Sequence, residues 1–287
     1  MRELKWYSES DFTIDGVSFH CAVGDYSGKT NRDRLLLLKD RGSLEQYATM
    51  FASHPPKNVL EFGIFQGGSP ALFSLWFGVE KFVGIDICEP VPAFDEFCRT
   101  HPVGSKIRTY YRTSQTDRER VENIVQAEFG TTAIDAIIDD ASHYYGHTRR
   151  TFEIAFPLLR PGGTYVIEDW GWAHWPHIHS HYAGQTPLSM LVMELLMLCA
   201  SRCDLVSEIR IFPAFAFIRK SPQAQPVAPL QMDGLYSKRG IEIVGAQDLN
   251  LVGVAHLIAS RVKHSVHRRL QRTRHKLQRA VRRARSQ

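Results

Sequence analysis

The sequence predicts an α/β protein whose core is a doubly wound, mostly parallel sheet of seven strands, the last of them antiparallel, with a helical basic tail at the C-terminal end. Short apolar runs alternate with amphipathic stretches from Asn58 onward, a pattern typical of strands joined by crossover helices. A glycine-rich turn follows the first run, as at the ligand-binding edge of a Rossmann-like sheet. The last two runs are so close in sequence that only an antiparallel connection fits between them.

Residues 1–55 are predicted to form an N-terminal extension. An Asp-Gly pair inside the alternating run FTIDGVSF (12–19) predicts a short hairpin. The sequence SLEQ (43–46) has the spacing of a capping box, which predicts a helix that begins there and runs to about Ser53. Two prolines at 55–56 then end the helix.

Residues 56–220 are predicted to form one α/β domain. The runs that predict strands are 58–62, 81–87, 106–111, 135–139, 164–169, 205–212 and 215–220. The stretches that predict helices lie near 69–78, 92–101, 117–129, 147–160 and 188–200. We expect helices on both faces of the sheet, because parallel strands are joined by crossovers that cover it.

The chain after residue 220 differs in character. Residues 221–254 are rich in Pro, Gln and Gly and predict an irregular accessory segment, and residues 255–287 predict an amphipathic helix with arginines opposite an apolar stripe. Residues 261–287 hold eleven Lys or Arg and no Asp or Glu, which leaves 24 basic and 30 acidic residues elsewhere, a net charge of −6. A nucleic-acid enzyme usually carries its basic residues around the cleft, which this distribution does not favour.

Composition narrows the class of protein further. The 287 residues are 44% hydrophobic and 23% charged, as in soluble globular proteins. No apolar stretch approaches the roughly 20 residues that a membrane span needs, and the first residues lack the apolar core of a secretory signal. Five scattered cysteines without a CxxC pair argue against a disulfide framework and predict a cytoplasmic location.

A candidate ligand site follows the first strand of the predicted domain, where the sequence reads EFGIFQGG from Glu61. Gly63 and Gly67 would let a ligand approach the backbone closely, and free N–H groups at a helix start can hold an anion. The alternative is a tight strand-to-helix turn without a ligand. Asp86 ends the next predicted strand, where its carboxylate can accept hydrogen bonds from two ribose hydroxyls.

A second candidate site lies at the ends of the fourth and fifth strands of the predicted domain. Asp140 and the pair Glu168-Asp169 leave these strands at the edge that carries the glycine turn, where unpartnered carboxylates are costly. Because oxygen ligands suit Mg²⁺, we expect these three residues to bind it. Asp139 is either a fourth ligand or a loop cap that points back into the sheet. His143 is expected to act as general base, the alternative being a hydrogen-bonded structural histidine.

These motifs carry a family resemblance. The spacing E-x-G-x-x-x-G, with an acid ending the next strand, resembles the S-adenosylmethionine site of class I methyltransferases over about residues 58–220. The block IIDDASHYYGHTRRTFEIAFPLLRPGGTYVIEDWGWAHWP is similar to the metal-dependent macrolide-sugar (mycinamicin-type) and rhamnosyl O-methyltransferases, a grouping that includes so-called cephalosporin hydroxylases. In that family D-x-x-H supplies a metal ligand and the base, and E-D supplies two more ligands. The matching positions are Asp140, His143, Glu168 and Asp169.

The resemblance also implies which residues bind the methyl donor, S-adenosylmethionine. They are Glu61, Gly63, Gly67, Asp86, Ser114 and Gln115. The first three would line the methionine end, Asp86 would hold the ribose, and the last two follow the third strand, where this fold contacts adenine. An N-cap at position 116 or 117 is an equally open interpretation of that turn. Residues 1–55 and the chain after 220 do not carry the resemblance.

Together these features predict an S-adenosylmethionine- and Mg²⁺-dependent O-methyltransferase that acts on a sugar hydroxyl of a glycosylated natural product or glycolipid. Vicinal hydroxyls chelated by the metal would become more acidic, and His143 would take the proton. Three alternatives stay open: methylation of a catechol-like small molecule, an RNA methyltransferase that uses the basic tail, and a non-catalytic binding protein on this fold. The family precedent is also compatible with a homo-oligomer.

Two segments allow several interpretations. The stretch from Trp170 to Tyr182 predicts an aromatic wall for the acceptor, packing at the sheet edge, or a zinc site. Its histidines are His174, His177, His179 and His181. The basic tail allows three interpretations: a solvated helix, a helix that lies on the anionic inner face of a membrane, or a segment that binds nucleic acid. The second would suit a glycolipid acceptor.

Overall fold

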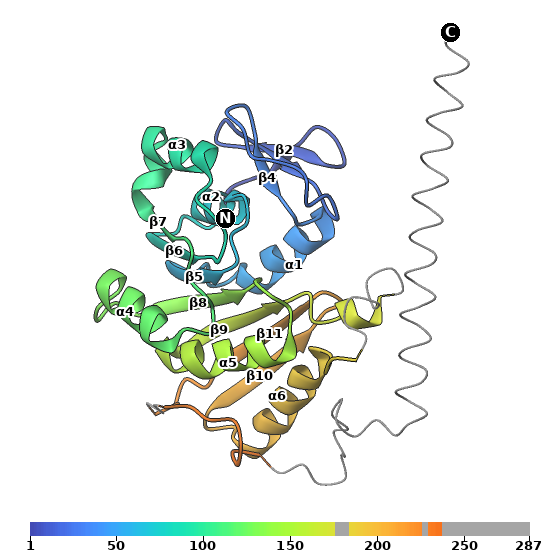
Figure 1. Ribbon diagram of the computed structural model, residues 1–287, viewed down its shortest axis with the longest axis vertical. Coiled ribbons are helices and arrows are strands. Elements are labelled where there is room, and N and C mark those ends of the chain that lie inside the picture. The colour runs from blue at the N-terminus through green and yellow to red at the C-terminus, as the bar shows by residue number, and fades with distance from the viewer. Residues whose placement is uncertain (176–183, 226–228, 237–287) are drawn as a thin grey trace, which may run out of the picture.

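The computed structural model describes residues 1–175, 184–225 and 229–236. Within them the chain forms a seven-stranded sheet with helices on both faces and a separate four-stranded sheet near the N-terminus (Figure 1). The remainder of the 221–254 segment, the whole 255–287 tail and the histidines at 177, 179 and 181 lie outside the described residues. No helix among the described residues combines the length and apolar character needed to cross a membrane.

The large sheet confirms the predicted architecture. Its strands are β5 (Asn58–Phe62), β6 (Lys81–Ile85), β7 (Ile107–Tyr110), β8 (Ile134–Asp139), β9 (Leu159–Glu168), β10 (Val206–Ile211) and β11 (Phe215–Lys220). They are arranged in the order β10-β11-β9-β8-β5-β6-β7. Neighbouring strands in the run β9-β8-β5-β6-β7 are all parallel, whereas β11 lies antiparallel to both of its neighbours. The order reverses at β5 and β8, so their carboxyl ends border the crevice where such sheets bind ligands.

Helices cover both faces of this sheet. They are α1 (Arg41–Phe51), α2 (Gly68–Trp76), α3 (Pro92–Thr100), α4 (Arg118–Glu128), α5 (Tyr145–Ala155) and α6 (Ser189–Ser201), with short 3-10 turns η1 (Pro102–Lys106), η2 (Phe156–Leu158) and η3 (Trp172–His174). Successive strand residues face opposite sides. Ile137 of β8 therefore packs in the core with α4, α5 and α6, and Ile138 packs in the core with α1, α2 and α3. Both faces are buried, which explains the nearly continuous apolar strands.

The N-terminal extension contains the predicted hairpin and more. β2 (Asp11–Ile14) and β3 (Val17–Cys21) pair antiparallel around Asp15-Gly16, whose φ angles of 49° and 80° fit a tight hairpin turn. β1 (Lys5–Trp6) extends the sheet on one side, and β4 (Leu35–Leu37) pairs parallel with β3 on the other. Neither flanking strand was expected, because two or three residues carry too little periodicity to read.

The start of α1 corrects one prediction. The helix begins at Arg41 with Asp40 as N-cap, whose carboxylate accepts a hydrogen bond of 2.7 Å from the Ser43 backbone N–H. The capping box predicted at 43–46 is therefore wrong, because Asp40 already occupies the N–H group three residues ahead. A helix over this stretch is confirmed.

The described part of the accessory segment lies along α5. Residues 221–225 and 229–236 form neither helix nor strand. The Met232 backbone N–H donates to Glu153 at 2.9 Å, and Asp233 forms an ion pair of 2.6 Å with Arg149. Met232 is fully buried, so this irregular stretch completes the core beside α5 and α6.

Candidate active site

A cavity of about 630 Å³ opens at the carboxyl ends of the parallel strands. The glycine turn, the segments that follow β6, β8 and β9, and residues 23–40 of the N-terminal extension all line it. The predicted site residues that line it are Gly63, Asp86, Ser114, Gln115, Asp140, His143, Glu168 and Asp169. Glu61 and Gly67 are absent from this lining, although both lie in the turn beside it. The topology thus brings two predicted sites from separate parts of the sequence to one cavity.

The glycine turn fits tightly against the end of β8. Gly63 has φ 86°, and a Cβ atom there would lie 2.0 Å from the backbone oxygen of Asp140. Gly67 has φ 82° and is the N-cap of α2, where a Cβ atom would lie 2.1 Å from the ring of Phe94. Both positions therefore require glycine for conformation and space. Gly63 sets the floor of the cavity, and Gly67 sets the packing of α2.

Glu61 lies beneath this turn, fully buried on β5. Its Oε2 accepts a hydrogen bond of 2.8 Å from Ser69, whereas its Oε1 has no partner among the described residues. Burial raises the pKa of this carboxyl well above its ordinary value, and the ammonium of Lys39 only partly opposes that shift. An orphaned buried acceptor of this kind suits a cationic or N–H-bearing ligand group.

Asp86 organises the glycine turn from the end of β6. Its Oδ2 accepts the backbone N–H groups of Ile64 and Phe65 at 2.7 and 2.8 Å, and its Oδ1 accepts that of Cys88 at 2.8 Å. A carboxylate offers about four acceptor positions. Three are used by the protein, which leaves about one for a ribose hydroxyl. The residue holds Phe65 in a left-handed conformation with φ 47°.

Ser114 and Gln115 follow β7, and both are already bonded to the protein. The Gln115 amide donates to Asp139 at 3.1 Å and to Thr151 at 2.7 Å, and its oxygen accepts from the Ser142 N–H at 3.1 Å. Ser114 shares a hydrogen bond of 2.9 Å with Thr116. The alternative of an N-cap at this turn also holds, because the Asp117 carboxylate caps α4.

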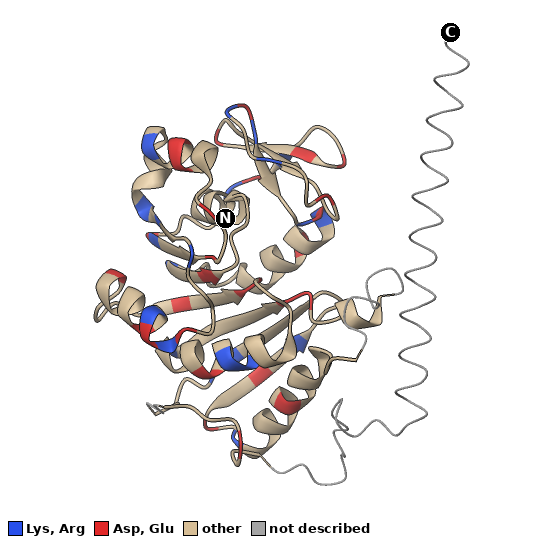
Figure 2. Cartoon of the chain, viewed as in Figure 1, with Lys and Arg blue, Asp and Glu red and all other residues tan. Residues whose placement is uncertain are grey.

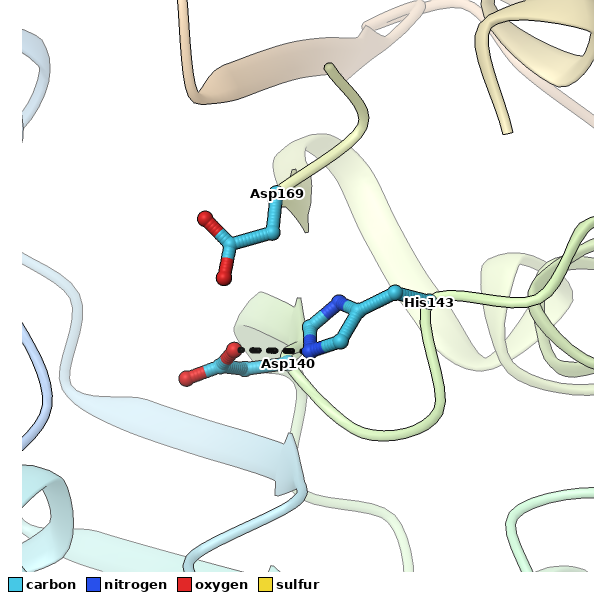
Figure 3. Close-up of side chains that lie close together, drawn as sticks. All are labelled: Asp140, His143 and Asp169. Carbon is cyan, nitrogen blue, oxygen red and sulfur yellow. Dashed lines mark ion pairs between the residues drawn. The ribbon is translucent and has the colours of Figure 1, made fainter. Parts of the chain in front are cut away.

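The carboxylates after β8 and β9 converge as expected from the parallel topology. Among the described residues, two overlapping groups have ligand atoms within 4.8 Å of one another. Asp140 forms one with His143 and Asp169, and the other with Glu61 and Glu168; Figure 3 shows the first. Asp140 belongs to both groups, whereas Glu168 and Asp169 belong to different ones, so neither group contains all three predicted ligands. Asp139 points elsewhere, because its carboxylate accepts hydrogen bonds of 3.1 Å from both Tyr165 and Gln115.

A lysine and a tyrosine from the N-terminal extension complete this cluster, and sequence reasoning missed both. Lys39 Nζ lies 2.6 Å from Asp140 Oδ2, and 2.8 and 2.7 Å from the two oxygens of Glu168. The Tyr47 hydroxyl donates to Glu168 Oε1 at 2.5 Å. Neither residue belongs to a recognisable motif. The one feature of the sequence that could have indicated Lys39 is its position directly after the apolar run that contains β4.

One lysine does not balance the charge of the cluster. Burial, followed by repulsion from Asp140, raises the pKa of Glu168 to about 7 and that of Asp169 to about 9. Both carboxyls also feel the opposing attraction of Lys39. Elsewhere the charge is mixed: Figure 2 shows acidic and basic positions interspersed along the described chain. Full ionisation of these carboxyls is therefore unfavourable with Lys39 as the partner, and a hard divalent cation bound to their oxygens would favour it.

His143 lies between Asp140 and an aromatic wall. Its Nε2 is 3.8 Å from Asp140 Oδ1, and its ring centre is 4.3 Å from that of Trp172. The Nδ1 atom is buried and has no hydrogen-bond partner among the described residues. Burial lowers the pKa of the imidazole, and Asp140 only partly offsets this. The ring is therefore neutral near pH 7, as a proton acceptor must be.

The tryptophans divide between two of the predicted roles. Trp172 and Trp175 line the cavity, as an aromatic wall would. Trp170 instead packs against the core, and its Nε1 donates to the Phe212 carbonyl at 2.9 Å. His174 shares a hydrogen bond of 2.8 Å with Ser189 and belongs to neither ligand group found in the described residues.

Comparison with known proteins places the chain beside methyltransferases. Residues 60–170 match the family described as "Methyltransferase domain". The chain is 34% identical over 125 residues to mycinamicin VI 2''-O-methyltransferase of Micromonospora griseorubida, which covers 41% of this chain and 28% of that protein. It is 29% identical over 131 residues to 8-demethyl-8-alpha-L-rhamnosyl tetracenomycin-C 2'-O-methyltransferase of Streptomyces olivaceus, covering 46% and 31%. These matches confirm the predicted resemblance.

A solved structure is similar over a larger share of the chain. The MycE methyltransferase in complex with Mg, SAH and mycinamycin VI is 26% identical, with a TM-score of 0.49, over 62% of this chain and 48% of that one. The chain matches less than a third of the length of each of the two curated relatives named above.

Proposed function

We propose, from the premise that residues 60–170 form a methyltransferase domain, that the protein transfers a methyl group from S-adenosylmethionine to a sugar hydroxyl in a metal-dependent reaction. The observation that carries this proposal is the meeting of Asp140, His143 and Asp169 within 4.8 Å at the edge of the cavity. A carboxylate pair with a neutral imidazole beside it can hold a cation and accept a proton in the same place.

The residues around the glycine turn fit the methyl donor. The cavity provides room beside Gly63, where the absence of a side chain exposes the backbone. The orphaned Oε1 of Glu61 suits the positively charged methionine end, although Glu61 acts from beneath the turn rather than from the cavity wall. One free acceptor position on Asp86 would take a ribose hydroxyl. Ser114 and Gln115 would border the adenine.

The acidic cluster fits Mg²⁺ by the chemistry of its donor atoms. Asp140, Glu168 and Asp169 would hold the ion through carboxylate oxygens, the ligands that Mg²⁺ prefers. When bound, the ion would make a chelated hydroxyl more acidic. Burial, followed by repulsion from Asp140, raises the pKa values of Glu168 and Asp169, and a bound cation would favour the ionised form of both carboxyls.

His143 would take the proton from the attacking hydroxyl. Its ring packs against Trp172, burial lowers the pKa of the imidazole, and Asp140 lies close enough to stabilise the imidazolium that forms. General base action of this kind contributes roughly 10² to 10⁴ in rate. Trp172 and Trp175 would offer flat faces to the acceptor.

The acceptor is proposed to be a rhamnosyl, olivosyl or similar sugar unit on a natural product, because the names of two relatives describe O-methyltransferases of a rhamnosyl tetracenomycin and an olivosyl-oleandolide. A catechol presents the same pair of vicinal oxygens, so an acceptor panel must include both classes. The cytoplasmic location and the role of the 255–287 tail stay predictions from the sequence.

The test is transfer of radiolabelled methyl groups from S-adenosylmethionine to glycosylated macrolides, rhamnosides and catechols. We expect transfer to glycosides that EDTA abolishes and Mg²⁺ restores. We also expect a loss of roughly 10² to 10⁴ in His143→Ala, with no change in His54→Ala, a control at an exposed histidine outside the cavity. Transfer that withstands both EDTA and His143→Ala would refute the mechanism. Preferential methylation of catechols would show that the acceptor is a catechol and not a sugar.

A further inference from the structure

The N-terminal extension places a positive charge inside the acidic cluster. Lys39 comes from the junction between β4 and α1, outside the matched residues 60–170. Its side chain is 4% exposed, and its Nζ contacts three carboxylate oxygens at 2.6 to 2.8 Å. These oxygens belong to Asp140 and Glu168, two of the three side chains proposed as metal ligands. Lys39 and a metal ion would therefore share the same acceptors.

Tyr47 fixes the carboxylate that Lys39 binds. Its hydroxyl donates to Glu168 Oε1, and its fully buried ring packs against Phe73 and Phe215, with ring centres 4.9 and 5.2 Å away. Both oxygens of Glu168 are thereby occupied by donors from the N-terminal extension. Its carboxylate is held in one orientation in the absence of any other ligand.

The Lys39 ammonium lies between two carboxylates and forms an ion pair with each, at 2.6 Å with Asp140 and 2.7 Å with Glu168. A buried ammonium between two carboxylates lowers the negative potential that a metal ion would experience. The third proposed ligand, Asp169, has no salt bridge to Lys39 among the described residues.

We propose that Lys39 is a positioning residue that limits the affinity of the acidic cluster for divalent metal ions, and that Tyr47 supports it by fixing Glu168. The inference rests on the proposed function, in which the same carboxylates hold the metal. It makes the N-terminal extension part of the site. A metal ion held against this competition would depend more strongly on additional oxygen ligands, such as those of an acceptor diol.

The test measures Mn²⁺ binding to the full chain by electron paramagnetic resonance, without donor or acceptor. We expect Lys39→Met to bind Mn²⁺ about tenfold more tightly, or better, because a unit charge beside a divalent ion has at least that effect even at the dielectric constant of water. Glu168→Gln should bind more weakly than wild type. The double variant, which removes one charge of each sign, should lie within about threefold of wild type.

Lys220→Met is the matched control. Lys220 is also 4% exposed, but its Nζ donates to the backbone oxygens of Phe156, Pro157 and Leu159, away from the cluster. Its substitution should leave Mn²⁺ affinity unchanged. If Lys39→Met alone fails to fold, the double variant is compared with Glu168→Gln and should bind about tenfold more tightly.

Equal Mn²⁺ affinity with and without Lys39, or weaker binding without it, would overturn the inference. Binding of S-adenosylhomocysteine is measured in the same samples. A wrong order of Mn²⁺ affinities with normal binding of that compound overturns the role of Lys39 alone. Absence of Mn²⁺ binding in all variants overturns the metal dependence of the proposed function together with this inference.

Discussion

Substitution of Gly63 by alanine should separate the effect of close packing from the effect of backbone strain. The new Cβ atom would lie 2.0 Å from the Asp140 carbonyl oxygen, and the positive φ of 86° would have to be kept. A left-handed conformation costs about 1–2 kcal/mol for a residue other than glycine, and overpacking a tight contact costs about 1–3 kcal/mol. We therefore expect a loss of about 3 kcal/mol in the free energy of unfolding.

Gly78 provides the matched control for this experiment. It has φ 66°, and a Cβ atom there meets no described atom within 4 Å, so Gly78→Ala should cost only the strain, about 1–2 kcal/mol. Urea unfolding measures both variants, and calorimetric titration measures S-adenosylhomocysteine binding. Gly63→Ala should also lose that binding, because the turn must move away from the end of β8. Equal stability of the two variants, with donor binding intact, would refute the reasoning.

Three further predictions concern the site and its scaffold. Mg²⁺ at 100 times its Kd should stabilise wild type by about 2.7 kcal/mol, seen as a rise in the thermal unfolding temperature. Asp140→Asn, at the residue shared by both ligand groups, should lose this rise, whereas the control Asp95→Asn, on α3, should keep it. Asp40→Ala should cost about 1 kcal/mol in urea unfolding and Ser43→Ala less, since Asp40 is the N-cap; the reverse order would favour a capping box. Burial lowers the pKa of Lys220 to about 8, below its unfolded value of 10.5. The free energy of unfolding of wild type should therefore rise relative to that of Lys220→Met as the pH rises from about 8 to 10.5. A difference between the two proteins that does not change with pH would contradict this.

The sequence determined the elements of the fold because their signals are local. Alternating apolar runs and amphipathic stretches predict the strands and helices of the large sheet, and a connection of three residues forces β11 antiparallel to β10. The same logic predicts that Asp140 meets the Glu168-Asp169 pair, because parallel strands end at one edge. The exact start of a helix is harder to predict when two neighbouring residues can both serve as the N-cap. Asp40 and Ser43 are such a pair, and the hydrogen bond from the Ser43 backbone N–H to the Asp40 carboxylate shows that Asp40 is the N-cap.

Only the tertiary structure decided how these residues share their partners. Lys39 is 101 residues from Asp140 and 129 from Glu168, and no pattern in the chain couples such positions. The turn of Asp139 into the sheet and the burial of Glu61 beneath the glycine turn depend likewise on neighbours from other strands. Periodicity reports which face of an element is buried, whereas the balance of charge in a buried cluster depends on every group within a few ångströms, whatever its place in the sequence.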